Sequence, residues 1–192
     1  MGFLDVLRGK PKLKGPAPDR LFAMSTAWVT IETEMNMTSA GQAAIVFQPL
    51  ATADFDAIVA DMEAVVGATG SETGTTVEKH DDSFGYRWMV LRDPDFDDLV
   101  VGLNAVNTAL QDGGYGDRVL CGLFAFADAS GRPVHIIYNV KRGTFYPFVP
   151  KPGGVQSRDT ETELRLRAQL DKELPIEPEL ERWFPLWGVP LS

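Results

Sequence analysis

Side chains that could carry out catalysis or bind a metal are few in this sequence. It holds two histidines, His80 and His135, and a single cysteine, Cys121. Neither histidine has a Cys or His partner at the spacing that zinc sites use. His80 is followed by Asp81 and Asp82, a run that could bind a divalent cation or act as a base and acid pair. Polar residues of this kind also form turns between strands, so we interpret the run as turn chemistry.

The remaining signs of catalysis are weak. Cys121 lies in an apolar run, and such surroundings raise the pKa of a thiol and quench its reactivity. The glycines of residues 70–74 have no lysine after them, and those of residues 113–116 lead into an expected strand, so neither stretch is a phosphate-binding loop. We expect no catalytic residue, metal or cofactor. A small metal-dependent or small-molecule enzyme is kept as an alternative, centred on His80, Asp81, Asp82 and Arg87.

Composition limits the class of protein. The chain has 192 residues, 44% hydrophobic and 23% charged, which is ordinary for one folded globular unit. A net charge of -9 argues against binding to nucleic acid, because that affinity comes from Lys and Arg at the phosphates. One cysteine cannot form an internal disulfide, and no stretch approaches the roughly 20 apolar residues of a membrane-spanning helix. We therefore expect a cytoplasmic protein.

The first 20 residues differ from the rest. Five basic and two acidic residues give this arm a charge of +3, which leaves -12 for the remainder of the chain. Apolar residues near its start precede a basic cluster, a combination suited to an anionic membrane surface. The alternative is that the arm docks on the folded domain. The membrane hypothesis names Phe3, Leu4, Leu7, Arg8, Lys10, Lys12 and Lys14.

Hydrophobic periodicity predicts an α+β core over residues 21–150. Strands are expected at 27–34 and 42–48, and a helix from about Phe55 that stops before Gly67. A strand pair at 76–79 and 84–91 follows, and Asp93-Pro94 marks the start of a second amphipathic helix. Two more strands are expected at 118–127 and 134–140, followed by a short extended segment at 143–149. Because strands and helices do not alternate singly, we predict an antiparallel or mixed sheet with both helices on one face.

The segment 151–192 is expected to pack on the same domain. Residues 160–163 have the capping-box pattern, and a charged helix should run from there to about Leu174. The tail from Pro175 is rich in proline and aromatic residues.

Two segments contain more aromatic residues and cations than the stability of the fold requires. Residues 141–150 and 181–188 combine cations with aromatic rings and proline, a mixture typical of contact surfaces. We predict a partner-binding surface that includes Lys141, Arg142, Phe145, Tyr146, Phe148, Trp183, Phe184 and Trp187. The alternative is that the tail folds back and covers the core beside residues 145–148.

Several strings of residues, taken together, point to a known family. They are residues 1–5 (MGFLD), 84–88 (FGYRW), 104–107 (NAVN), 141–148 (KRGTFYPF) and 182–188 (RWFPLWG). With these strings the chain resembles the PspA-associated protein PspAB of actinobacteria. The resemblance implies a cytosolic protein of the phage-shock-type envelope-stress system, linked with PspA and with an HtpX-type membrane protease. It implies no known catalytic residue.

We therefore predict a non-enzymatic adaptor or regulator that acts through protein contacts. Its expected location is the cytoplasm, with peripheral contact at the inner face of the membrane as an extension. Besides the enzyme, a homo-oligomeric structural scaffold is a second alternative.

Overall fold

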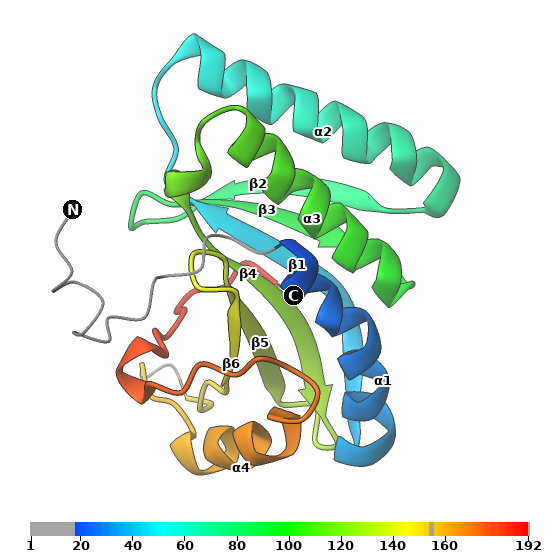
Figure 1. The fold of residues 1–192 in the computed structure, drawn as a ribbon, viewed down its shortest axis with the longest axis vertical. Coiled ribbons are helices and arrows are strands. Elements are labelled where there is room, and N and C mark those ends of the chain that lie inside the picture. The colour runs from blue at the N-terminus through cyan, green and yellow to red at the C-terminus, as the bar shows by residue number, and fades with distance from the viewer. Residues whose placement is uncertain (1–17, 154–155, 192) are drawn as a thin grey trace, which may run out of the picture.

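A six-stranded antiparallel sheet forms the centre of the protein (Figure 1). The computed structural model describes residues 18–153 and 156–191. The strands lie in the order β2-β3-β1-β4-β5-β6. Their bounds are β1 Met37–Phe47, β2 Thr76–Asp81, β3 Arg87–Arg92, β4 Val119–Asp128, β5 Pro133–Asn139 and β6 Thr144–Phe148. The predicted α+β class and antiparallel sheet are confirmed.

Three helices cover one face of this sheet. They are α1 (Met24–Met35), α2 (Ala53–Thr73) and α3 (Phe96–Asp112), and α3 lies closest to the central strands (Figure 1). The ring of Phe96 at the start of α3 lies 5.3 Å from Trp28 of α1 and 5.4 Å from Phe124 of β4. Phe55 of α2 reaches Phe47 of β1 at 5.9 Å. Aromatic contacts of this kind join the helices to the sheet.

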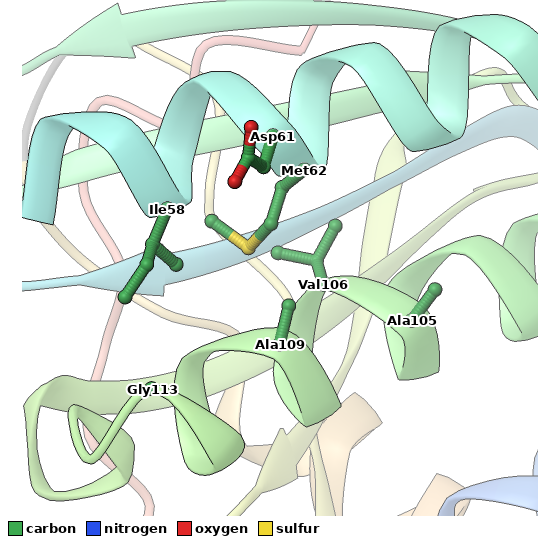
Figure 2. A pocket seen from close by; sticks show the side chains of 7 residues that line it. All are labelled: Ile58, Asp61, Met62, Ala105, Val106, Ala109 and Gly113. Atoms are coloured by element: carbon green, nitrogen blue, oxygen red, sulfur yellow. The ribbon is translucent and has the colours of Figure 1, made fainter.

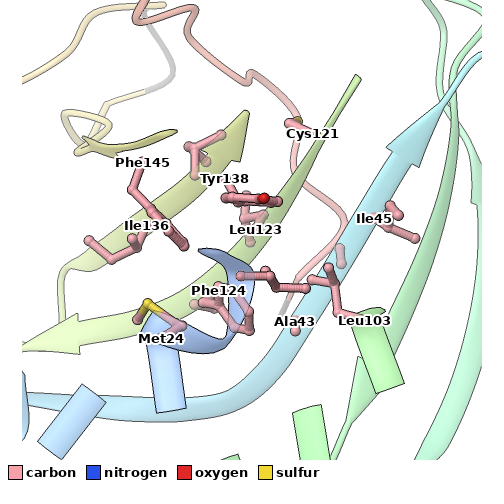
Figure 3. Close-up of a cluster of buried hydrophobic side chains, with 14 of the residues drawn as sticks. Met24, Ala43, Ile45, Leu103, Cys121, Leu123, Phe124, Ile136, Tyr138 and Phe145 are labelled. Atoms are coloured by element: carbon pink, nitrogen blue, oxygen red, sulfur yellow. The ribbon is translucent and has the colours of Figure 1, made fainter. Parts of the chain in front are cut away.

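The core continues across both faces of the central strands. Residues 43–47 of β1 are all buried, whichever face they point to. This explains why β1 appears in the sequence as an apolar run instead of an alternating pattern. Figure 3 shows side chains of helices and strands meeting in this core, among them Met24, Leu103 and Phe124.

The strand predicted at 27–34 is wrong, because these residues belong to α1. Their alternation is typical of a strand, and Val29, Thr30 and Ile31 favour β structure. The buried residues of the segment are instead Met24, Ala27 and Ile31, at spacings of three and four. This stripe packs on α3 and β1, and tertiary packing outweighs the local preference. Asn36, in the left-handed conformation at φ 54°, ends the helix.

Two helix ends also differ from the prediction. α2 continues through Gly67 and Gly70 to Thr73, since each glycine in a long helix costs only about 1 kcal/mol relative to alanine. α3 begins after Asp95, whose side chain accepts a hydrogen bond from the backbone N–H of Asp97, and not at Asp93-Pro94. The predicted strands from 76 onward are confirmed with small shifts of their ends.

The C-terminal segment packs along the sheet edge formed by β6. Helix α4 spans Thr160–Leu170, so it ends before the predicted Leu174, and its N-cap is Asp159 instead of Thr160. The chain then runs parallel to β6: the N–H of Phe145 donates to the carbonyl of Pro175 at 2.9 Å, and the N–H of Glu177 donates to the carbonyl of Phe145 at 2.8 Å. This pairing shields the edge of the sheet.

None of the helices in the described part of the chain combines the length and apolar character needed to cross a bilayer.

Candidate functional site: an aromatic cleft beside the C-terminal tail

The largest hollow described lies on the sheet face opposite the helices. Phe47 points to the helices, and side chains alternate along a strand, so its neighbour Val46 points the other way. Val46 lies in register with Trp88 of β3 and Cys121 of β4. Together with the tail these side chains enclose a cleft of about 490 Å³, which we call the tail cleft. It is lined by Val46, Asp82, Phe84, Tyr86, Trp88, Leu120, Cys121, Asn139, Lys141, Tyr146, Phe184, Pro185, Leu186 and Trp187.

Asp82 organises the turn between β2 and β3, which forms one side of the cleft. Its carboxylate accepts hydrogen bonds from the backbone N–H groups of Phe84 and Tyr86, at 2.8 and 2.9 Å, and from the indole N–H of Trp88 at 2.9 Å. Partial burial opposes ionisation, but these donors favour it, and the pKa of Asp82 lies below its usual value. The turn is thereby fixed with the Phe84 ring exposed.

The tail forms the opposite side and is held by buried rings. Trp183 stacks on Tyr146 with ring centroids 6.0 Å apart, and its indole N–H donates to the carbonyl of Glu177 at 3.0 Å. The hydroxyl of Tyr146 donates to the carbonyl of Phe184 at 3.0 Å. The rings of Trp187 and Phe148 form an edge-to-face contact with centroids 5.1 Å apart. The tail therefore does fold back on the core, as the alternative for this segment predicted.

A buried carboxylate fixes the chain just before the tail. Glu177 is fully buried and accepts a hydrogen bond from Arg142 at 2.6 Å and one from the hydroxyl of Thr144 at 3.0 Å. Burial alone would raise the pKa of Glu177, but these donors and the N–H of Glu179 outweigh it, and the pKa is lowered. The side of the cleft is thus attached to β6 through a charged group that stays ionised.

A second buried carboxylate, Glu163 of α4, supports the same region. It accepts hydrogen bonds from the N–H of Val149 at 2.8 Å and from Arg158 at 2.7 Å. Burial raises its pKa, which the two donors only partly oppose. The guanidinium of Arg158 also lies 5.4 Å above the ring of Phe148 and donates to the carbonyl of Trp183. Helix α4 and the tail are therefore held by one shared network.

Exposed apolar side chains gather at the mouth of the cleft. Phe84 is 65% exposed, Phe184 is 61% exposed and Leu120 is 38% exposed. Lys141 is also exposed there, and it forms no ion pair with any residue that the structure describes. Exposed phenylalanines around a preformed apolar cleft are typical of a binding surface.

The predicted partner-binding residues divide into two groups. Phe145, Tyr146, Phe148 and Trp183 are buried, and Arg142 is paired with Glu177, so these five residues build the support of the site. The other three, Lys141, Phe184 and Trp187, line the tail cleft, and the buried ring of Tyr146 also forms part of its lining.

Sequence reasoning missed the part of the site that comes from β3, β4 and their turns. Phe84, Tyr86 and Trp88 line the cleft, and so does Leu120. The available signal was the density of aromatic residues in 84–88, next to an expected turn.

The four residues of the enzyme alternative do not all line the same hollow. His80 lies in β2 and not in a loop, in register with Trp88, so it faces the tail side and comes within 3.4 Å of Glu78. Arg87 points to the helix side, where it pairs with Asp81 at 2.6 Å and approaches Asp56 of α2 at 4.0 Å. His80, Asp81 and Asp82 line a smaller hollow of about 250 Å³ beside Trp187, without Arg87.

The other groups that could react are buried. Burial raises the pKa of Cys121 to about 12, so its thiol stays protonated at neutral pH. His135 of β5 stacks on Phe148, and burial lowers its pKa to about 4. Within the described ranges, no group of three His, Cys, Asp or Glu side chains could hold a metal ion.

A second apolar hollow, of about 260 Å³, lies between α2 and α3 (Figure 2). Ile58 and Met62 of α2 face Val106 and Ala109 of α3, and Asp61 is the sole charged residue of its lining. It offers no group of polar side chains, so the tail cleft is the better candidate site.

Fold and site together define an α+β protein whose sheet carries helices on one face and an aromatic cleft, closed by its own tail, on the other. The chain belongs to the family described as PspA associated protein B, which matches residues 1–191. This confirms the resemblance seen in the sequence and supports a PspA-associated role. No curated protein and no solved structure matches the chain.

Proposed function

We propose that this chain is a non-enzymatic adaptor of a phage-shock-type envelope-stress response that binds PspA through the tail cleft. The observation that supports this most is the group of exposed apolar residues, Phe84, Leu120 and Phe184, around a cleft of about 490 Å³. The family description supplies the partner, since it names association with PspA.

The cleft has the physical properties of an anchor site. Burying an exposed phenylalanine side chain contributes about 1.5–3 kcal/mol, so Phe84 and Phe184 together supply about 3–6 of the roughly 8 kcal/mol of a micromolar affinity. Both sides of the cleft are held before binding, by Asp82 on the turn and by Tyr146 and Trp183 under the tail. A preformed site loses little entropy when a partner fills it.

Lys141 adds a polar feature at the same mouth. Because it has no described carboxylate to pair with, its ammonium group is available to a partner carboxylate. We expect it to affect the association rate and salt dependence more than the affinity, as charges at the rim of an interface do.

The test is a titration of the full-length chain with purified PspA from the same organism. The double variant Phe84→Ser/Phe184→Ser should weaken binding at least tenfold, since it removes both exposed rings of the cleft. The control is Val29→Ser/Val101→Ser, which removes exposed apolar side chains from α1 and α3 on the opposite face. Unchanged binding by the cleft variant, or equal weakening by both variants, would contradict the proposal.

A cytoplasmic location with peripheral contact at the inner face of the membrane is also a proposal, as is a link to an HtpX-type protease. The residues of the membrane hypothesis, Phe3 to Lys14, lie outside the described part of the chain. Co-sedimentation with anionic vesicles tests the location: the Phe3→Ser/Leu7→Ser variant should bind less than the parent, and equal binding would exclude the arm as the anchor. Crosslinking of the chain to an HtpX-type protease in cells tests the second link.

A further inference from the structure

We propose that the N-terminal arm, residues 1–17, docks in the tail cleft of its own chain and must leave before a partner can bind there. The docking stands on the geometry and charge described below. Its regulatory consequence rests on the proposed function.

The described chain begins next to a turn that borders the cleft. The 3-10 helix Pro18–Ala23 precedes α1, and the guanidinium of Arg20 in it donates to the carbonyl groups of Arg142 and Gly143, at 3.5 and 3.4 Å. These two residues belong to the connection between β5 and β6, in which Lys141 lines the cleft, as does Asn139 at the end of β5. The arm is therefore tethered close to one rim of the cleft.

The arm is long enough to reach the site. Eleven peptide units connect Leu7 to Pro18, and at about 3.3 Å each they span up to roughly 36 Å. A domain of this size has a radius of gyration of roughly 16 Å. The apolar start of the arm can therefore reach any part of the cleft without strain in the tether.

The arm and the cleft have complementary chemistry. The arm offers Phe3, Leu4 and Leu7, and the cleft offers an aromatic lining with two exposed phenylalanine rings. The basic residues at 8–14 follow directly, and the arm's charge of +3 faces a remainder that carries -12. Asp82 supplies a carboxylate at the rim of the cleft. Because the lining itself holds one carboxylate, Asp82, and one ammonium group, Lys141, the attraction for the basic arm comes from the acidic domain as a whole, and the cleft contributes the apolar contacts.

Because the arm is tethered to the domain, even a weak contact fills most of the clefts. A tether of about ten residues gives an effective concentration on the order of 1 mM. If the free segment binds the cleft with a dissociation constant of about 0.1 mM, the tethered arm fills about nine-tenths of the clefts. The apparent affinity for a competing partner then falls about tenfold.

Docking is tested without PspA, using a fluorescein-labelled peptide of residues 1–14 and fluorescence anisotropy. The acceptor is the full-length Phe3→Ser/Leu7→Ser chain, whose own arm has lost its apolar side chains. We expect saturable, sub-millimolar binding to this variant and at least fivefold weaker binding to the parent chain, whose cleft is filled. Adding Phe84→Ser/Phe184→Ser to the acceptor should abolish binding, and adding Val29→Ser/Val101→Ser should not change it.

Three results would overturn docking in cis. They are absence of peptide binding, peptide binding that survives loss of Phe84 and Phe184, and equal binding by the parent and the arm variant. A sedimentation mass of two parent chains that becomes one in the arm variant would also overturn it, since the arm would then occupy the cleft of a second copy.

The regulatory consequence is tested by the affinity for PspA. Phe3→Ser/Leu7→Ser should bind PspA more tightly than the parent, by the factor that the peptide's dissociation constant predicts. An unchanged affinity would overturn competition for the cleft. If no variant bound PspA while the peptide still entered the cleft, the proposed function would fail and the docking would stand.

Discussion

Lowering the pH should destabilise the fold through one buried histidine. His135 is 6% exposed between Ala125 and Phe148 on the neighbouring strands, and burial lowers its pKa from about 6.5 to about 4. In the unfolded chain the same group has its ordinary pKa, so between pH 6.5 and 4 the unfolded state binds the proton more readily. Its contribution to stability is therefore complete above pH 6.5 and is lost as the pH falls towards 4.

The size of this effect follows from the two pKa values. A difference of about 2.5 units at 1.36 kcal/mol per unit gives about 3 kcal/mol over the whole window, of which about 2.5 kcal/mol is lost by pH 4.5. For a domain with 5–15 kcal/mol of stability this is a large fraction.

Urea unfolding at pH 7 and pH 4.5 measures it. The difference in unfolding free energy between the two pH values should be about 2.5 kcal/mol smaller in His135→Leu than in the parent, because carboxylates titrate alike in both. The matched control His80→Gln, which replaces the other histidine at a site 42% exposed, should keep the parent's difference.

The same pH dependence in the parent and in His135→Leu would refute the reasoning. If the variant does not fold, an NMR titration of the His135 ring protons in the parent decides the matter, and a pKa near 6.5 would refute it equally.

Three further predictions concern the support of the tail cleft. Trp183→Ala should lower the unfolding free energy by about 3–5 kcal/mol in urea titrations, because the ring is buried against Tyr146, and a loss below 1 kcal/mol would contradict its packing role. Tyr146→Phe should cost about 1 kcal/mol by removing the hydrogen bond to Phe184, while Tyr86→Phe, for which the structure gives no side-chain hydrogen bond, should cost less. Cys121 should resist iodoacetamide at pH 8 in the folded chain and react fully in urea, and rapid labelling of the native protein would contradict its raised pKa.

Helices whose apolar residues recur at helical spacing could be predicted from the sequence, and helices without this recurrence could not. α3 carries Leu99, Leu103, Val106 and Leu110 on one buried stripe, and the sequence located it to within two or three residues. In α1 only Met24, Ala27 and Ile31 are buried, and the β-branched residues between them favoured a strand. The deciding contact is the stacking of Trp28 on Phe96, far apart in the sequence, which no local pattern contains.

The candidate site was predictable only in part, for a related reason. Its lining comes from several separate segments, so no contiguous motif represents it. Aromatic density in residues 141–150 and 181–188 located the region. It could not show that Trp183 is buried while its neighbour Phe184 is exposed, since that difference depends on which face of the tail meets Tyr146.

Because Trp183 is buried and its neighbour Phe184 is exposed, the stability of the tail is coupled to the function proposed for the cleft. The buried residues Trp183 and Tyr146 hold the segment that presents Phe184, so a variant that loosens the tail also disorders one side of the binding surface. Conversely, a ligand that binds only the formed cleft stabilises the folded state by RT ln(1 + [L]/Kd), about 2.7 kcal/mol at a hundredfold excess over Kd. PspA, or the arm peptide added to the Phe3→Ser/Leu7→Ser chain, should therefore raise the melting temperature of the chain. Phe84→Ser/Phe184→Ser should remove that increase while leaving the melting temperature of the free chain nearly unchanged, because both rings are exposed.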